Sequence, residues 1–205
     1  MTKKELQKQI LMNLKSAAVQ DGHAMTSIQG ATLYEVINGY IFEIFISVKR
    51  DKSAYFADLS CKPFEFDDLF WEITENPKLS MGKRVMGAFT VRLIGFANLG
   101  PLDVDELKSV IEAYADMKAY FGEYAPNRFY DLCMKLDPTR LERNRVLRHF
   151  LEAKFKSREE MIQSCRDRIA ADDTGGFTFV QDYGSEKSFF DYYLEYLLRS
   201  GPDEH

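Results

Sequence analysis

The sequence predicts an α+β fold, in which an antiparallel β-meander of about four strands is flanked by an N-terminal helix and a C-terminal helical half. Residues 32–48 are rich in β-branched and aromatic residues and contain an Asn-Gly pair, which is typical of a tight hairpin turn. Beyond Asp103 the apolar residues recur every three to four positions, which is the period of an amphipathic helix. This change of period divides the chain into a β-rich part and a helical part.

The N-terminal segment is expected to form a helix over residues 3–19. Thr2 and Glu5 have the spacing of a capping box, in which each side chain binds the other residue's backbone N–H. Apolar residues follow at helical spacing: Leu6, Ile10, Leu14 and Ala17. Because the charged start leads into no apolar run, no signal peptide is expected.

The strongest structural signal is the hairpin formed by strands 32–37 and 40–48 around Asn38-Gly39. A two-residue loop fixes the register and predicts three opposite pairs: Ile37 with Tyr40, Glu35 with Phe42, and Leu33 with Ile44. Strand 40–48 is apolar on both faces, so it is expected to be central. A third strand is expected at 54–61 and a fourth at 88–94.

The helical half is expected to begin after Gly100-Pro101, which should close the β-rich part. The first predicted helices run from Asp103 to about 124 and over about 128–136. A third helix should begin at Asp137-Pro138, and a fourth should begin at the Ser157–Glu160 capping box and end at about 171. A short strand is expected at 177–180, followed by a last helix from Ser185 to Gly201. No linker separates the halves, so we expect one domain of residues 1–205, with 1–100 β-rich and 101–205 helical.

Charge and cysteine content indicate the class of protein. A net charge of −5 disfavours non-specific binding to nucleic acid or anionic membranes and suits a basic protein partner. Cys61, Cys133 and Cys165 are an odd number of widely spaced thiols, as in a reducing compartment. We therefore expect a cytoplasmic protein with no membrane span and no cofactor.

A short acidic and aromatic segment is the main candidate site. The helix expected at about 66–73 carries Glu65, Asp67 and Asp68 at its start, and the only tryptophan, Trp71, lies off its apolar stripe. Exposed Trp beside carboxylates is typical of a protein-binding hot spot. Two other interpretations stay open: the acids complement the helix dipole, and another element, such as the C-terminal helix, covers the tryptophan.

Chemical functions have weaker support in the sequence. Glu65, Asp67 and Asp68, together with Asp58, could bind a hard cation in a metal-dependent hydrolase or serve a small-ligand binder. Cys133, His149 and Cys165 lack the closely spaced ligand pairs of a zinc site and are expected in the core. No phosphate loop, nucleophile elbow or metalloprotease motif occurs, so no catalytic residue and no metal ligand is assigned.

Residues 137–168 are locally basic, with nine Lys or Arg against six Asp or Glu. This balance would suit an RNA-associated helical module centred on residues 140–168. The charges alternate in sign, however, which is typical of ordinary solvated helices.

The order of elements in the first hundred residues and the stretch Tyr55–Ile73 resemble small bacterial domains, some of which occur beside toxin genes and are regarded as immunity proteins. The resemblance covers about half the chain and transfers no functional residue. Together with the acidic charge, it implies a non-enzymatic protein-binding module that neutralises a basic toxin or enzyme.

Overall fold

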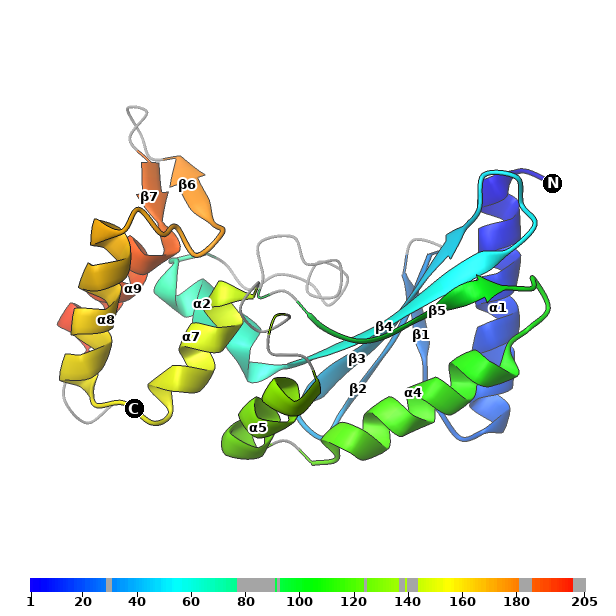
Figure 1. Ribbon diagram of the computed structural model, residues 1–205, viewed down its shortest axis with the longest axis horizontal. Helices are drawn as coiled ribbons and strands as arrows, with labels where there is room; N and C mark the ends of the chain where they lie inside the picture. The colour runs from blue at the N-terminus through cyan, green and yellow to red at the C-terminus, as the bar shows by residue number, and fades with distance from the viewer. Residues whose placement is uncertain are drawn as a thin grey trace.

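The computed structural model describes residues 1–28, 31–76, 91, 93–123, 125–136, 139, 144–180 and 186–200. The described chain has the predicted α+β architecture: an N-terminal helix, a five-stranded antiparallel meander, and a helical C-terminal half (Figure 1). The meander consists of β1 (Thr26–Ile28), β2 (Thr32–Ile37), β3 (Tyr40–Val48), β4 (Tyr55–Pro63) and β5 (Ile94–Leu102), in that order across the sheet. The helices are α1 (Lys3–Gln20), α2 (Glu65–Ile73), α4 (Lys108–Phe121), α5 (Pro126–Leu136), α7 (Arg145–Ala153), α8 (Arg158–Ala170) and α9 (Phe189–Arg199), and a small hairpin joins β6 (Thr178–Val180) to β7 (Glu186–Ser188).

The predicted hairpin register is confirmed. All three expected pairs between β2 and β3 are present, and Asn38 and Gly39 both have positive φ, at 51° and 79°. These are the angles that a type I′ turn requires, and Asn and Gly adopt them at the lowest cost. Strand β3 lies at the centre of the sheet, as its apolar sequence predicted.

Helices α1 and α4 pack side by side on one face of the sheet. Helix α4 is attached to β2 through the buried Glu35, whose Oε2 accepts hydrogen bonds from Lys118 Nζ at 2.6 Å and from Tyr114 Oη at 3.0 Å. Burial acts to raise the pKa of Glu35, but the hydrogen bonds from Lys118 and Tyr114 outweigh it and hold the pKa below its usual value. These contacts lie on the face of α4 that meets the sheet, whereas Glu112 and Asp116 of the same helix are exposed.

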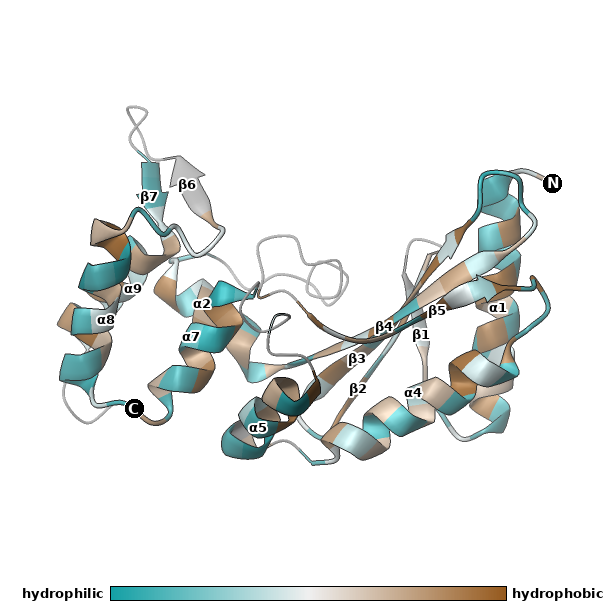
Figure 2. Cartoon of the chain, viewed as in Figure 1, coloured by the Kyte–Doolittle hydropathy of each residue, from teal (hydrophilic) through white to brown (hydrophobic). Residues whose placement is uncertain are grey.

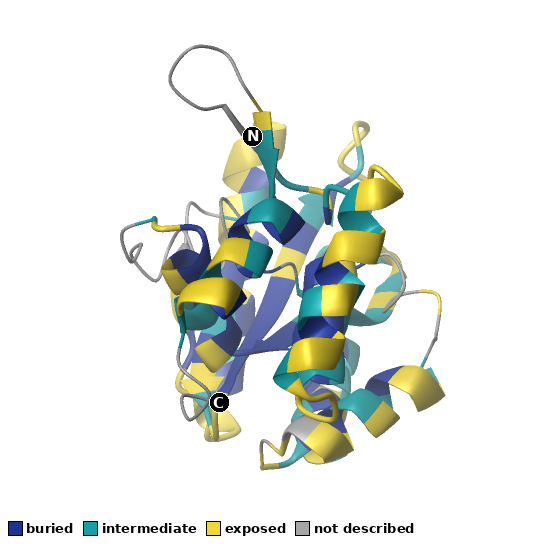
Figure 3. Cartoon of the chain, turned by 90° about the vertical axis from the view of Figure 1, so that its left-hand side faces the viewer, coloured by how far each residue is buried: buried dark blue, intermediate teal, exposed yellow. Residues whose placement is uncertain are grey.

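The helical half packs around α2, at the opposite end of the sheet from α1 (Figure 1). The Phe70 ring stacks on Phe189 of α9 with centroids 5.6 Å apart and contacts Phe177 at 4.8 Å. The helices nearest the viewer in Figure 3 carry buried residues on one side and exposed residues on the other. Hydrophobic residues concentrate on β3 and β4, whereas hydrophilic residues are prominent on α1, α5 and α8 (Figure 2).

The boundary predicted at Gly100-Pro101 is wrong. Strand β5 occupies residues 94–102, so Gly100-Pro101 lies inside a strand instead of closing the β-rich half. Proline is tolerated because β5 is the last strand of the described sheet and can lack a ladder N–H. Gly100 has φ +133°, and a Cβ there would lie 2.9 Å from the Tyr55 carbonyl oxygen, so this close approach requires glycine.

The other differences concern short elements and helix starts. Three-residue β1 is too short to show an alternating pattern, and it was not predicted. Helix α9 starts after Ser188, which forms a capping box with Asp191, rather than at Ser185. Helix α4 starts at Lys108 rather than near Asp103. Most of the strand predicted at 88–94, and the helix start at Asp137-Pro138, lie outside the described residues.

None of the helices in the described part of the chain combines the length and the hydropathy needed to cross a bilayer.

Candidate functional site

The predicted acidic-aromatic segment forms α2, but its residues do not share one surface. Trp71 is 1% exposed and Asp67 is 0% exposed, whereas Glu65 is exposed and Asp68 is half-buried. The prediction that these four residues form an exposed patch is therefore wrong for Asp67 and Trp71. Of these four residues, Glu65 and Asp68 remain accessible to a partner.

Trp71 is buried because α2 is covered on more than one side. The helix packs against β4 and also against α9, so the side chains that lie off the Phe70 stripe meet a second layer. Tyr196 Oη donates to Glu72 Oε1 at 3.1 Å, and Arg199 Nη1 lies 2.6 Å from Glu75 Oε1, which joins α9 to α2. The interpretation in which the C-terminal helix covers the tryptophan side of α2 fits this packing.

Asp67 of α2 forms a buried ion pair with Lys62 of β4, and both side chains also contact the backbone of Val91. Lys62 Nζ lies 2.9 Å from both Asp67 carboxylate oxygens, and both side chains are 0% exposed. Lys62 Nζ also donates to the Val91 carbonyl at 2.9 Å, and Val91 N donates to Asp67 Oδ1 at 3.2 Å. Because removing two charges from water is costly unless they are closely paired, this geometry ties α2 and Val91 to strand β4.

The carboxylates proposed for metal chemistry are not brought together. Asp67 binds Lys62, and Asp58 on β4 accepts a hydrogen bond from Asn98 on β5. Within the described ranges, no three or more His, Cys, Asp or Glu side chains are grouped as a metal ion would require. The segment around 65–68 therefore lacks the converging oxygens of a hard-cation site.

Glu43, which was not among the predicted site residues, is a buried acid with a strongly raised pKa. It lies on the sheet face opposite α1 and α4, between Tyr34 on β2 and Ser60 on β4 in the register, and it is 8% exposed. Burial raises the pKa of Glu43 to about 7, although the Lys62 charge and a hydrogen bond with Ser60 act to lower it. A carboxyl group that titrates near neutral pH can bind or release a proton under cellular conditions. The alternating pattern of β3 placed Glu43 off the core face but gave no sign of its burial.

We expect stability to fall as the pH rises from about 4.5 to about 7, because folded Glu43 keeps a proton that the unfolded chain releases. Glu43→Gln should remove this slope and raise the free energy of unfolding above pH 7 by up to about 3 kcal/mol. Urea denaturation at pH 5 and pH 8 measures the effect, and the exposed Glu159→Gln is the control. Parallel pH profiles for the wild type and Glu43→Gln would contradict the assigned burial.

The predicted core thiols and histidine are buried. Cys165 Sγ lies 3.6 Å from His149 Nε2, and burial lowers the pKa of His149 to about 3 and raises the pKa of Cys165 to about 12. Both groups are therefore neutral near pH 7, unlike an activated thiolate pair. Cys133 lies elsewhere, close enough to Cys61 and Tyr40 to affect their ionisation.

The basic residues of the helical half mostly have local acidic partners. Arg145 and Arg168 both bind Asp173, at 2.8 and 3.0 Å, and Arg148 binds Glu152 at 2.6 Å. Residues 140–143 lie outside the described part. These ion pairs reduce the positive potential that an RNA backbone would need.

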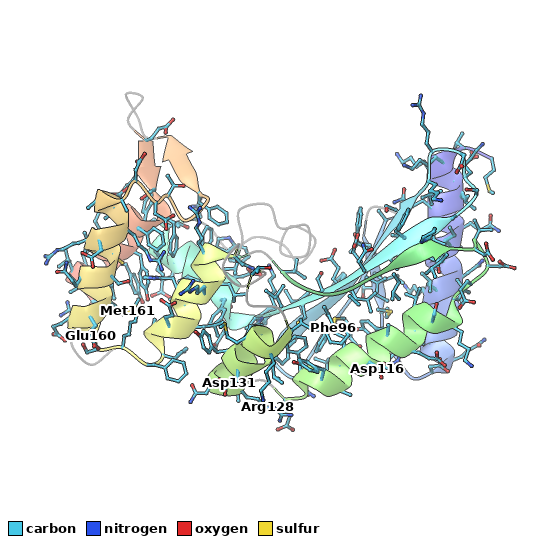
Figure 4. The ribbon with its side chains drawn as sticks, viewed as in Figure 1. Phe96, Asp116, Arg128, Asp131, Glu160 and Met161 are labelled. Carbon is cyan, nitrogen blue, oxygen red and sulfur yellow. The ribbon has the colours of Figure 1, made fainter. Side chains whose placement is uncertain are left out.

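A set of acidic residues that the sequence analysis did not single out lies along α4, the loop that precedes it and the bend that follows it. Residues 103–123 contain six carboxylates and two lysines, a net charge of −4. Five of the six carboxylates are exposed and the sixth is half-buried; we call the set the acidic belt: Asp103, Asp105, Glu106, Glu112, Asp116 and Glu123. Lys118 is occupied by Glu35, and Lys108 lies 3.5 Å from Glu112. The belt therefore presents a strong negative field, and Figure 4 marks Asp116 on α4.

Comparison with known proteins identifies no relative: no protein-family model, no curated protein and no solved structure matches the chain.

Proposed function

We propose that this chain is a non-enzymatic protein-binding module that recognises a basic protein, in the manner of an immunity protein that neutralises a toxin or enzyme. The observation that carries the proposal is the acidic belt: the segment 103–123 that holds it has a net charge of −4, against −5 for the whole chain. Such a field attracts a basic partner and orients it during approach. It also repels phosphate backbones, which argues against nucleic acid as the partner.

The contacts and the exposure of the acidic residues considered for metal chemistry support a binding role. Asp67 and Asp58 are engaged in contacts with Lys62 and Asn98 that hold the fold together. The accessible residues Glu65 and Asp68 extend the acidic character to α2. Three buried free thiols are compatible with the cytoplasm of a bacterial cell, where we place the protein.

The test is capture from a lysate of the source organism with the intact tagged chain, followed by association-rate measurements on the captured protein. Reversing two charges of the belt, Asp116→Lys with Glu123→Lys, should lower the association rate about tenfold at low salt. The matched control reverses two exposed acids outside the belt, Asp131→Lys on α5 with Glu159→Lys on α8, and should change the rate less than about twofold. Capture of no stoichiometric basic partner, or equal rates for the two variants, would refute the proposal.

A second candidate function is binding of a small ligand, which the environment of Glu43 favours over the segment at 65–68. Glu43 and Ser60 place a carboxyl and a hydroxyl group on opposite positions of one sheet face. Native mass spectrometry of the chain purified from its source organism would show a bound molecule. That molecule should be lost in Glu43→Gln, and a spectrum of the bare chain would remove this candidate.

A further inference from the structure

A groove lies where the end of α1 meets the start of α4, at one end of the acidic belt. Its volume is about 360 Å³, and its lining combines apolar and acidic residues: Ala17 and Asp21 from the end of α1, with Asp105, Glu106, Leu107 and Ile111 from the entry to α4. Helices α1 and α4 contact each other, and the Tyr55 hydroxyl donates to the Glu106 carbonyl, so the walls are held in place by the core.

The electrostatics of the groove favour a cation. Asp21, Asp105 and Glu106 outnumber Lys108, which lies beside Glu112. The Ser109 N–H donates to Glu106 Oε1 at 3.0 Å and holds the pKa of Glu106 below its usual value, so this carboxylate is ionised. The last turn of α1 carries no basic residue, so the negative end of its dipole is uncompensated within the helix.

The apolar lining restricts the type of cation. The half-buried side chains of Ala17 and Leu107 offer a hydrocarbon surface to a long aliphatic stem, and Ile111, at 7% exposed, adds only its edge. A metal ion or a small amine would leave this surface in contact with water. A planar guanidinium can bind two carboxylates in forked geometry while its methylene groups cover the apolar floor.

We propose that this groove binds an arginine side chain of the basic protein partner and so anchors that partner at the end of the acidic belt. The inference rests on the proposed function, because it assigns one contact point within the same acidic surface.

The experiment titrates the full-length chain with N-acetyl-arginine amide and follows the backbone amides by NMR. Saturable shifts are expected at Ala17, Gln20 and Leu107, and N-acetyl-citrulline amide, which has the same shape without the charge, should produce none. Asp21→Asn with Asp105→Asn should weaken binding of the arginine probe about fivefold. Asp131→Asn on α5 with Glu159→Gln on α8 also removes two negative charges, but away from the groove, and should leave the affinity for the arginine probe unchanged.

Shifts that do not saturate, that spread over all acidic residues, or that are equal in both variants would overturn the groove assignment. If any of these results is obtained while the Asp116→Lys, Glu123→Lys variant still associates with the captured partner about tenfold more slowly, the proposed function stands and only the arginine groove fails. If that variant also binds the partner normally, the acidic surface has no role and both proposals fail.

Discussion

Lys62→Met is expected to destabilise the protein by about 3–5 kcal/mol, because it leaves the Asp67 carboxylate buried without its counter-charge. For a chain of this size the loss corresponds to a fall in Tm of about 6–20 °C. Methionine fills nearly the same volume as the lysine stem, so the loss reports the missing charge rather than a cavity. Thermal and urea unfolding, followed by circular dichroism, measure it.

Two further variants separate the buried charge from other effects of the substitution. Lys62→Met with Asp67→Asn should recover most of the stability, because no unpaired charge remains and the amide oxygen can still accept from Val91 N. Lys154→Met removes a lysine whose ion pair with Glu65 is half-exposed at 3.8 Å, and should cost less than about 1 kcal/mol. If Lys62→Met cost no more than Lys154→Met, the pair would not be buried as described.

Trp71→Ala is expected to destabilise the protein by about 3–5 kcal/mol, because a fully buried indole is replaced by a cavity between α2 and the elements packed on it. Trp71→Phe should cost less, since most of the volume remains. Had Trp71 been an exposed contact residue, the alanine variant would be nearly as stable as the wild type. Urea denaturation of the three proteins distinguishes the two cases.

The same residue can be tested without a substitution, because Trp71 is the only tryptophan of the chain. Its fluorescence should be protected from iodide in the folded state and quenched readily in urea. Strong quenching of the folded protein would show an accessible indole and would restore the prediction of a surface hot spot. Until then, loss of partner capture in Trp71→Ala reports unfolding, and the belt variants are the proper test of binding.

Local patterns were sufficient for much of the fold. The Asn38-Gly39 turn and the capping boxes at Thr2 and Ser157 are confirmed, as is the register of β2 on β3. In each case a few neighbouring residues satisfy backbone hydrogen bonds or fix a turn, so the physical cause lies within about ten positions. The change from strand to helix period likewise follows from which residues can share one apolar face.

The candidate site depended on contacts between segments far apart in the sequence. A helix of nine residues shows one apolar stripe in its pattern, but α2 is covered on a second side by α9, more than a hundred positions later. Packing between separate elements also explains the burial of Glu43 and the groove between α1 and α4. It likewise brings Lys62 of β4 to Asp67 of α2.

The sequence by itself determined the fold class, the hairpin register and the acidic net charge, because these follow from local geometry and composition. Only the tertiary structure decided which acids face solvent. Tyr114 and Lys118 of α4 bind Glu35 of the sheet while Glu112 and Asp116 of the same helix are exposed, whereas Asp67 and Trp71 of α2 are buried. Whether a side chain is exposed depends on which element covers it, and that is a property of the packed chain.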